Sequence, residues 1–133
     1  MLHEKPKLLF THNPMNENFC NAIAYAHTNQ YDHLIVDELS RGDYRFIDRT
    51  HGVVLVGPQT SDADILSVFR SEGDYLAFIQ EVHKRCKKVA AVLNKPDVLP
   101  GDNKEIDLLI ETVRGERTIT SIAREISDFF QSG

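Results

Sequence analysis

The sequence has no tryptophan, only two cysteines and two methionines, and no long hydrophobic run among its 133 residues. Its apolar runs are a handful of residues long, such as residues 52–57, whereas a membrane-spanning helix needs ~20. The first residues, MLHEKPK, lack the apolar core of a secretory signal. We therefore expect no membrane association, and so few cysteines favour a reducing, cytoplasmic location.

Basic residues are in the minority. Lys and Arg number 15 against 20 Asp and Glu, which gives a net charge of −5. Nucleic-acid-binding domains usually carry a basic excess, so nucleic acid is not an expected partner. One local exception is the stretch HKRCKK at residues 83–88. We interpret it either as the solvated face of a helix or as a contact for an anion or an acidic partner.

The motifs of common phosphate-binding and hydrolytic sites are also missing. No glycine-rich loop follows the first apolar run, which excludes a dinucleotide fingerprint and a Walker A loop. The segment Asn94-Lys95-Pro96-Asp97 matches the guanine-reading NKxD pattern, but without a phosphate loop we interpret it as a turn. There is no GxSxG elbow, and the six histidines form no i, i+4 pair, so neither acyl transfer nor a metal site is expected.

Short apolar segments alternate with helical patterns along the chain. We expect strands at residues 7–12, 33–37, 52–57, 89–93 and within 106–113, where IDLLIE is the best candidate. We expect helices at residues 16–28, at 74–88 after a cap at Asp74, and from Thr118 or Thr120 through Phe129, with shorter ones at 44–49 and 61–69. Cys20 and Cys86 fall on apolar helix faces and are expected in the core.

This alternation predicts an α/β fold. Strands without a polar face indicate a parallel sheet that is covered by helices on both sides. The length fits a single domain, residues 1–133, with its core at about residues 7–130. Five strands joined by right-handed crossovers favour a three-layer, flavodoxin-like sheet of order 2-1-3-4-5. Ligands of such sheets bind beyond the carboxyl ends of the strands, here the loops at residues 11–18, 37–43, 57–62 and 94–101.

Three polar residues are candidates for chemistry in this fold. His12 and Asn13 follow the first strand, where they either cap the next helix or contact a ligand. Glu81 lies on the helix after the third strand, one position off its apolar stripe. It either pairs at i, i+4 with Arg85 or leans over the strand ends. In the second position it would stabilise positive charge at an N-glycosidic bond, or attack that bond.

Four segments also have parallels, in the same order, in a known family. LLFTH at residues 8–12 is similar to a first strand followed by a serine–histidine pair, and DELSRG at 37–42 to a long loop after the second strand. GVVLVGPQTSDA at 52–63 and VAAVL at 89–93 are similar to the third and fourth strands. Together they resemble Toll/interleukin-1 receptor (TIR)-like domains. The chain departs from that pattern in two places, because Thr11 replaces the serine and Ala77 and Phe78 stand where a tryptophan is common.

The resemblance implies a TIR-like signalling domain that binds a nucleotide such as NAD and cleaves its N-glycosidic bond, with NAD as substrate rather than resident cofactor. It implies Glu81 as the catalytic residue and the following ligand contacts: Thr11, His12, Asn13, Asp37, Arg41, Gln59 and Thr60. Nucleoside deoxyribosyltransferases are a related alternative, although their glycine-rich first loop is missing here. The other alternative is a non-catalytic interaction module, which associates with itself or with another signalling domain through residues 83–88 and the acidic loop at 37–43.

Overall fold

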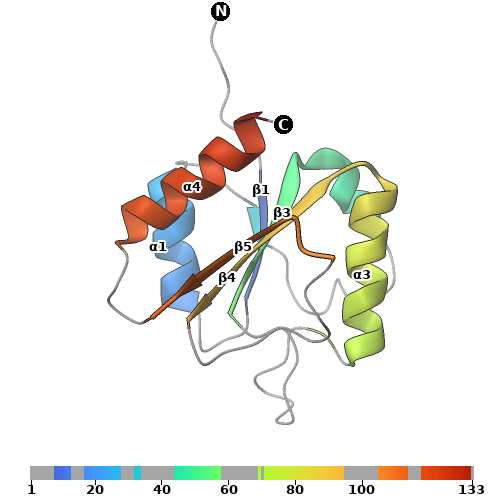
Figure 1. Ribbon diagram of the computed structural model, residues 1–133. Helices are drawn as coiled ribbons and strands as arrows, with labels where there is room; N and C mark the ends of the chain where they lie inside the picture. Colours follow the sequence, from blue (N-terminus) through green and yellow to red (C-terminus); the bar gives the residue numbers. More distant parts are fainter. Residues whose placement is uncertain are drawn as a thin grey trace, which may run out of the picture.

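The computed structural model describes residues 8–12, 17–27, 32–33, 44–57, 69, 71–94, 105–113 and 118–132. A parallel sheet lies at its centre, with helices on both faces (Figure 1). The strands are β1 (Leu8–His12), β2 (Asp32–His33), β3 (Gly52–Val56), β4 (Lys88–Asn94) and β5 (Leu108–Thr112). They lie in the order β2-β1-β3-β4-β5, and all neighbours are parallel. The α/β class and the parallel sheet predicted from the sequence are confirmed.

The strands differ in length. β1, β3, β4 and β5 have five to seven residues each, whereas β2 has two and pairs only with Leu9 and Phe10. The second strand was expected at residues 33–37, of which 34–37 lie outside the described residues. β5 lies within the range expected for it, residues 106–113, and begins two residues after the start of the best candidate, IDLLIE.

The central strands are buried on both sides. All five residues of β3 are buried, and β-branched valines dominate its sequence, GVVLV. Val54 and Val56 face one side of the sheet, and Val53 and Leu55 face the other. This burial on both faces explains why the strand shows a continuous apolar run rather than an alternating pattern.

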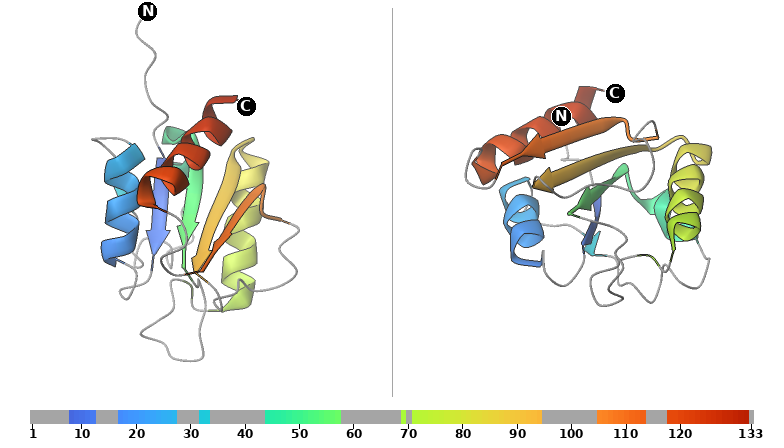
Figure 2. Two further views of the ribbon diagram at one scale, coloured as in Figure 1. Left: turned by 60° about the vertical axis from the view of Figure 1, so that its left-hand side comes forward. Right: turned by 60° about the horizontal axis from the view of Figure 1, so that its bottom comes forward.

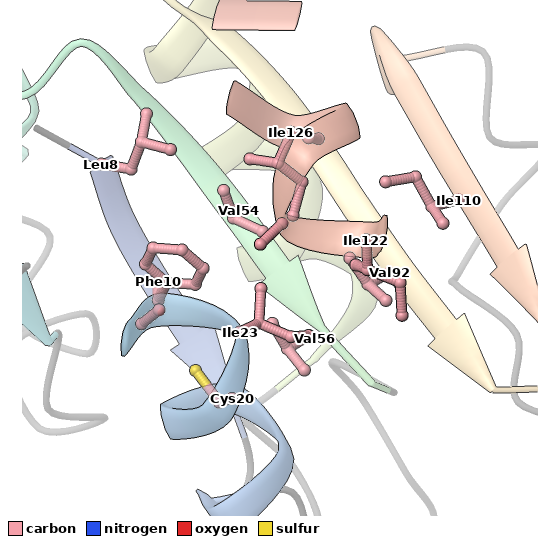
Figure 3. Close-up of a cluster of buried hydrophobic side chains, with 13 residues drawn as sticks. Leu8, Phe10, Cys20, Ile23, Val54, Val56, Val92, Ile110, Ile122 and Ile126 are labelled. Carbon is pink, nitrogen blue, oxygen red and sulfur yellow. The ribbon is translucent and has the colours of Figure 1, made fainter. Parts of the chain in front are cut away.

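One face of the sheet is covered by α1 (Glu17–His27) and α4 (Ile119–Ser132). Figure 3 shows Ile23 of α1 and Ile122 and Ile126 of α4 packed over the valines of β3 and β4. Full burial of one such side chain contributes ~1.5–3 kcal/mol to folding. Near the start of β3, a Cβ at Gly52 would overlap the ring of Phe130, so glycine lets the end of α4 approach the sheet.

The opposite face is covered by α3 (Glu72–Lys84) and by the 3-10 helix η2 (Arg45–Arg49), which lies within the short helix expected at residues 44–49. Tyr75, Phe78, Ile79 and Val82 of α3 are buried against the sheet. The ring of Phe69 lies 5.3 Å from that of Phe78, centroid to centroid. Apart from Phe69, the helix expected at 61–69 lies outside the described residues.

At both ends of α3, the structure differs from what the sequence predicts. Ser71, not Asp74, caps α3, because the Ser71 hydroxyl accepts a hydrogen bond from the Asp74 N–H at 3.1 Å. The helix ends at Lys84, and Cys86 lies beyond it with φ of 62°, exposed rather than in the core. Of the two caps considered for α4, Thr118 and Thr120, the structure shows Thr118, whose hydroxyl accepts a hydrogen bond from the Ser121 N–H at 3.1 Å.

Candidate functional site

The carboxyl ends of the strands meet at one edge of the sheet, which we call the carboxyl edge (Figure 2). Its outermost strand residues are His12, Val56, Asn94 and Thr112, and the register pairs His12 with Val56 and Asn94 with Thr112. Thr11 is buried and His12 is half-buried. Because β1 lies between β2 and β3, these two side chains stand where the strand order reverses, the place at which open α/β sheets commonly bind ligands.

The structure brings together only part of the predicted ligand set. Thr11 and His12 lie at the carboxyl edge, beside the end of β3. Five further predicted contacts lie outside the described residues: Asn13, Asp37, Arg41, Gln59 and Thr60. The described part of the site is therefore a threonine and a histidine at the end of β1.

Glu81 lies at the other end of the sheet. We call that end the amino edge, where Gly52 and Lys88 pair as the first residues of β3 and β4. Since α3 returns the chain from the carboxyl edge to Lys88, its last turns lie at the amino edge (Figure 1). Glu81 is in those last turns, three residues before the helix ends at Lys84. The structure therefore does not place Glu81 beside Thr11 and His12.

Glu81 belongs instead to an ion-pair network with Arg85 and Asp48. The Arg85 Nε lies 3.5 Å from Glu81 Oε2, which is the i, i+4 pairing expected from the sequence. One terminal nitrogen of Arg85 donates to Asp48 Oδ2 at 2.7 Å, and this hydrogen bond is the largest contribution that raises the arginine pKa. Asp48 belongs to η2, so Arg85 joins the end of α3 to the segment before β3. This arrangement gives Glu81 a structural partner.

A second polar cluster at the amino edge involves His83. Its Nε2 lies 2.9 Å from Asp107 Oδ2, and its Nδ1 lies 3.8 Å from Glu105 Oε2. The same Asp107 oxygen accepts the Val89 N–H at 2.8 Å, while the Asp107 N–H donates to the Val89 carbonyl at 2.9 Å. Asp107 thus holds the start of β4, the end of α3 and the approach to β5 together.

Two tyrosines have raised pKa values, Tyr75 within α3 and Tyr44 just before η2. Burial raises the pKa of Tyr75 to about 12. Burial, followed by the negative charges of Asp74 and Glu81, raises the pKa of Tyr44. Phe78 is fully buried, and its ring lies 6.2 Å from that of Tyr44, centroid to centroid. These aromatic residues serve the packing of α3 rather than an open site.

The two cysteines have different surroundings. Cys20 is fully buried on the core-facing side of α1, as predicted, and burial raises its pKa to about 12. Cys86 is exposed, which corrects its predicted place in the core. The cause is the early end of α3: Cys86 follows the last helical turn, so it no longer continues the apolar stripe.

The described residues contain no group of three His, Cys, Asp or Glu side chains arranged to hold a metal ion. None of the helices in the described ranges combines the length and the apolar character needed to cross a bilayer. Comparison with models of protein families and with curated proteins gives no match for this sequence.

The pairings at the amino edge were not found from the sequence, apart from that of Glu81 with Arg85. Asp48 is 37 residues from Arg85, and Asp107 is 24 residues from His83. Neither pair has a spacing that local periodicity can detect. The available signal was topological: parallel strands bring the segments before β3, β4 and β5 to one edge.

Proposed function

We propose that this chain is a non-catalytic protein-interaction module with a flavodoxin-like, TIR-like topology. The observation that carries the proposal is the position of Glu81, which pairs with Arg85 at the amino edge. A carboxylate acts on a glycosidic bond only when it lies beside the reacting carbon. The candidate ligand residues Thr11 and His12 lie at the opposite edge. The exposed thiol of Cys86 favours a reducing, cytoplasmic setting for the module.

Nucleotide binding without cleavage is a second proposal, supported by one feature of the carboxyl edge. Thr11 and His12 end a strand at the reversal of strand order, which favours a small ligand such as NAD there. The described acidic residues near this edge, Glu72 and Asp74 at the start of α3, oppose a pyrophosphate. Because of this negative charge, we favour protein interaction over nucleotide binding as the function of the module.

Incubation with NAD tests both proposals. We expect no nicotinamide release from the wild-type protein or from Glu81→Ala. Turnover that Glu81→Ala abolishes while the fold is retained would refute the non-catalytic proposal. A calorimetric titration with NAD, compared between wild type and His12→Ala, examines binding separately. Saturable binding that weakens in His12→Ala supports the second proposal. If the wild-type protein gives no heat of binding with NAD, the second proposal is refuted.

A further inference from the structure

β5 is the last strand of the sheet, and we call its outer flank the β5 edge (Figure 1). On its inner flank it pairs with β4, and within the described ranges no strand lies beyond it. The pairing from Leu108 to Thr112 is continuous, without a bulge. Proteins commonly blunt such an edge with proline, lysine or a bulge, because its N–H and C=O groups can pair with another chain. The sequence of β5, LLIET, contains neither proline nor lysine.

One hydrogen bond shows which backbone groups of β5 point away from β4. The Asp107 N–H donates to the Val89 carbonyl of β4 at 2.9 Å. Backbone groups alternate in direction along a strand, so those of Leu109 and Glu111 also point to β4. The residues whose backbone groups point outward are Leu108, Ile110 and Thr112. Their N–H and C=O groups recur every ~6.6 Å, which matches the repeat of another extended chain.

The side chains along the β5 edge indicate which sequence fits beside it. Alternation puts Leu109, Glu111 and Val113 on the side of the sheet that faces α3, where Leu109 packs against the core. Glu111 is exposed, and Val113, directly after β5, is 52% exposed. Side chains opposite each other on neighbouring strands lie ~5 Å apart and interact. An added strand would therefore fit best with apolar side chains beside Leu109 and Val113 and a basic one beside Glu111.

We infer that the partner of this module is an extended segment of another protein, which adds to the sheet as a strand beside β5. The inference rests on the proposed interaction function and names the chemistry of the partner. The expected segment carries an apolar, a basic and an apolar residue at every second position, which matches the α3 side of β5. In this mode of binding, main-chain hydrogen bonds supply the affinity and side chains supply the specificity.

Amide hydrogen exchange measured by NMR tests the pairing residue by residue. In the free protein, the N–H groups of Leu109 and Glu111 should exchange slowly, because β4 holds them, while those of Leu108, Ile110 and Thr112 exchange fast. The probe is a capped synthetic peptide, Val-Thr-Lys-Thr-Val, whose symmetric order fits either strand direction. At saturation it should slow the three outward N–H groups by roughly tenfold or more. The same peptide with every amide N-methylated cannot donate and should have no effect.

Charge exchange at Glu111 tests the recognition of the basic residue. Glu111→Lys should weaken binding of the lysine peptide roughly two- to fivefold. A peptide with glutamate in place of lysine should bind this variant better than it binds wild type. Asp128→Lys is the matched control, because Asp128 is exposed in α4, on the other face of the sheet, and its replacement changes net charge equally. Far-UV circular dichroism and the urea midpoint establish that both variants are folded.

Three results would overturn the inference. The first is unchanged exchange of the outward N–H groups at millimolar peptide. The second is slow exchange of these groups in the free protein that is lost on dilution, because a second copy of the chain would then occupy the β5 edge. The third is equal weakening of peptide binding by Glu111→Lys and Asp128→Lys. Each leaves the non-catalytic proposal standing, which only Glu81-dependent turnover of NAD refutes.

Discussion

Replacing Cys86 with glycine should stabilise the protein. Cys86 has φ of 62°, the left-handed conformation, just beyond the end of α3. Its N–H donates to the His83 carbonyl at 2.9 Å, and the Lys87 N–H donates to the Val82 carbonyl at 3.1 Å. This pair of hydrogen bonds is the Schellman ending of a helix, in which glycine usually occupies the left-handed position.

The size of the expected gain in unfolding free energy follows from two opposing contributions. A side chain in the left-handed region costs ~1–2 kcal/mol relative to ordinary helical backbone. Glycine removes that cost but gives the unfolded chain more freedom, which offsets ~0.4–1 kcal/mol. Because Cys86 is exposed, the replacement sacrifices little packing. We expect Cys86→Gly to raise the free energy of unfolding by ~0.5–1 kcal/mol, or ~2–4 °C in Tm for a chain of this size.

Urea unfolding followed by circular dichroism measures this change, with Cys86→Ala as the matched control. Alanine removes the thiol but keeps the Cβ that strains the turn, so its stability should remain near that of wild type. The difference between the glycine and alanine variants isolates the backbone effect. A glycine variant no more stable than the alanine variant would refute the reasoning, since the left-handed turn would then carry no measurable cost.

Two further predictions concern packing and thiol chemistry. Gly52→Ala should lower the free energy of unfolding by ~1–3 kcal/mol, because its new Cβ meets the Phe130 ring. In the double variant Gly52→Ala with Phe130→Ala, the ring that the new Cβ meets is gone. The loss of unfolding free energy, measured in urea, should therefore be smaller than the sum of the losses of the two single variants. Strictly additive losses would contradict the predicted overlap. A colorimetric thiol titration should count one thiol per native chain, Cys86, and two in denaturant, because burial raises the pKa of Cys20 to about 12. Two rapidly reacting thiols in the folded protein would show that the packing of α1 on the sheet does not protect Cys20.

The sequence predicts the regular parts of this fold well. The run GVVLV gave the position of β3, because a strand buried on both faces needs apolar residues throughout. The spacing of Ile119, Ile122 and Ile126 located α4, since residues at that spacing share one face of a helix. These elements are recognisable because burial leaves a continuous apolar run in β3 and a helical period in α4.

The helix end and the candidate site were harder to predict. Nothing in the run HKRCKK indicates that Cys86 adopts a left-handed backbone where glycine is usual. The position of Glu81 was open to prediction from topology. A helix that connects parallel strands must return the chain to their starting edge, so a residue in its last turns lies far from the carboxyl ends. The periodicity of the sequence shows on which face of a helix a residue lies, but it does not show at which end of the sheet that residue lies.

The packing of α4 against α1 has a consequence for synthesis of the chain. Ile122, Ala123 and Ile126 of α4 cover the same sheet face as Ile23 of α1. Until α4 has left the ribosome, the nascent protein exposes the part of that apolar surface that α4 covers in the fold. We therefore expect the elements before α4 to fold stably only once α4 is available to pack on them, and truncations that remove α4 to aggregate.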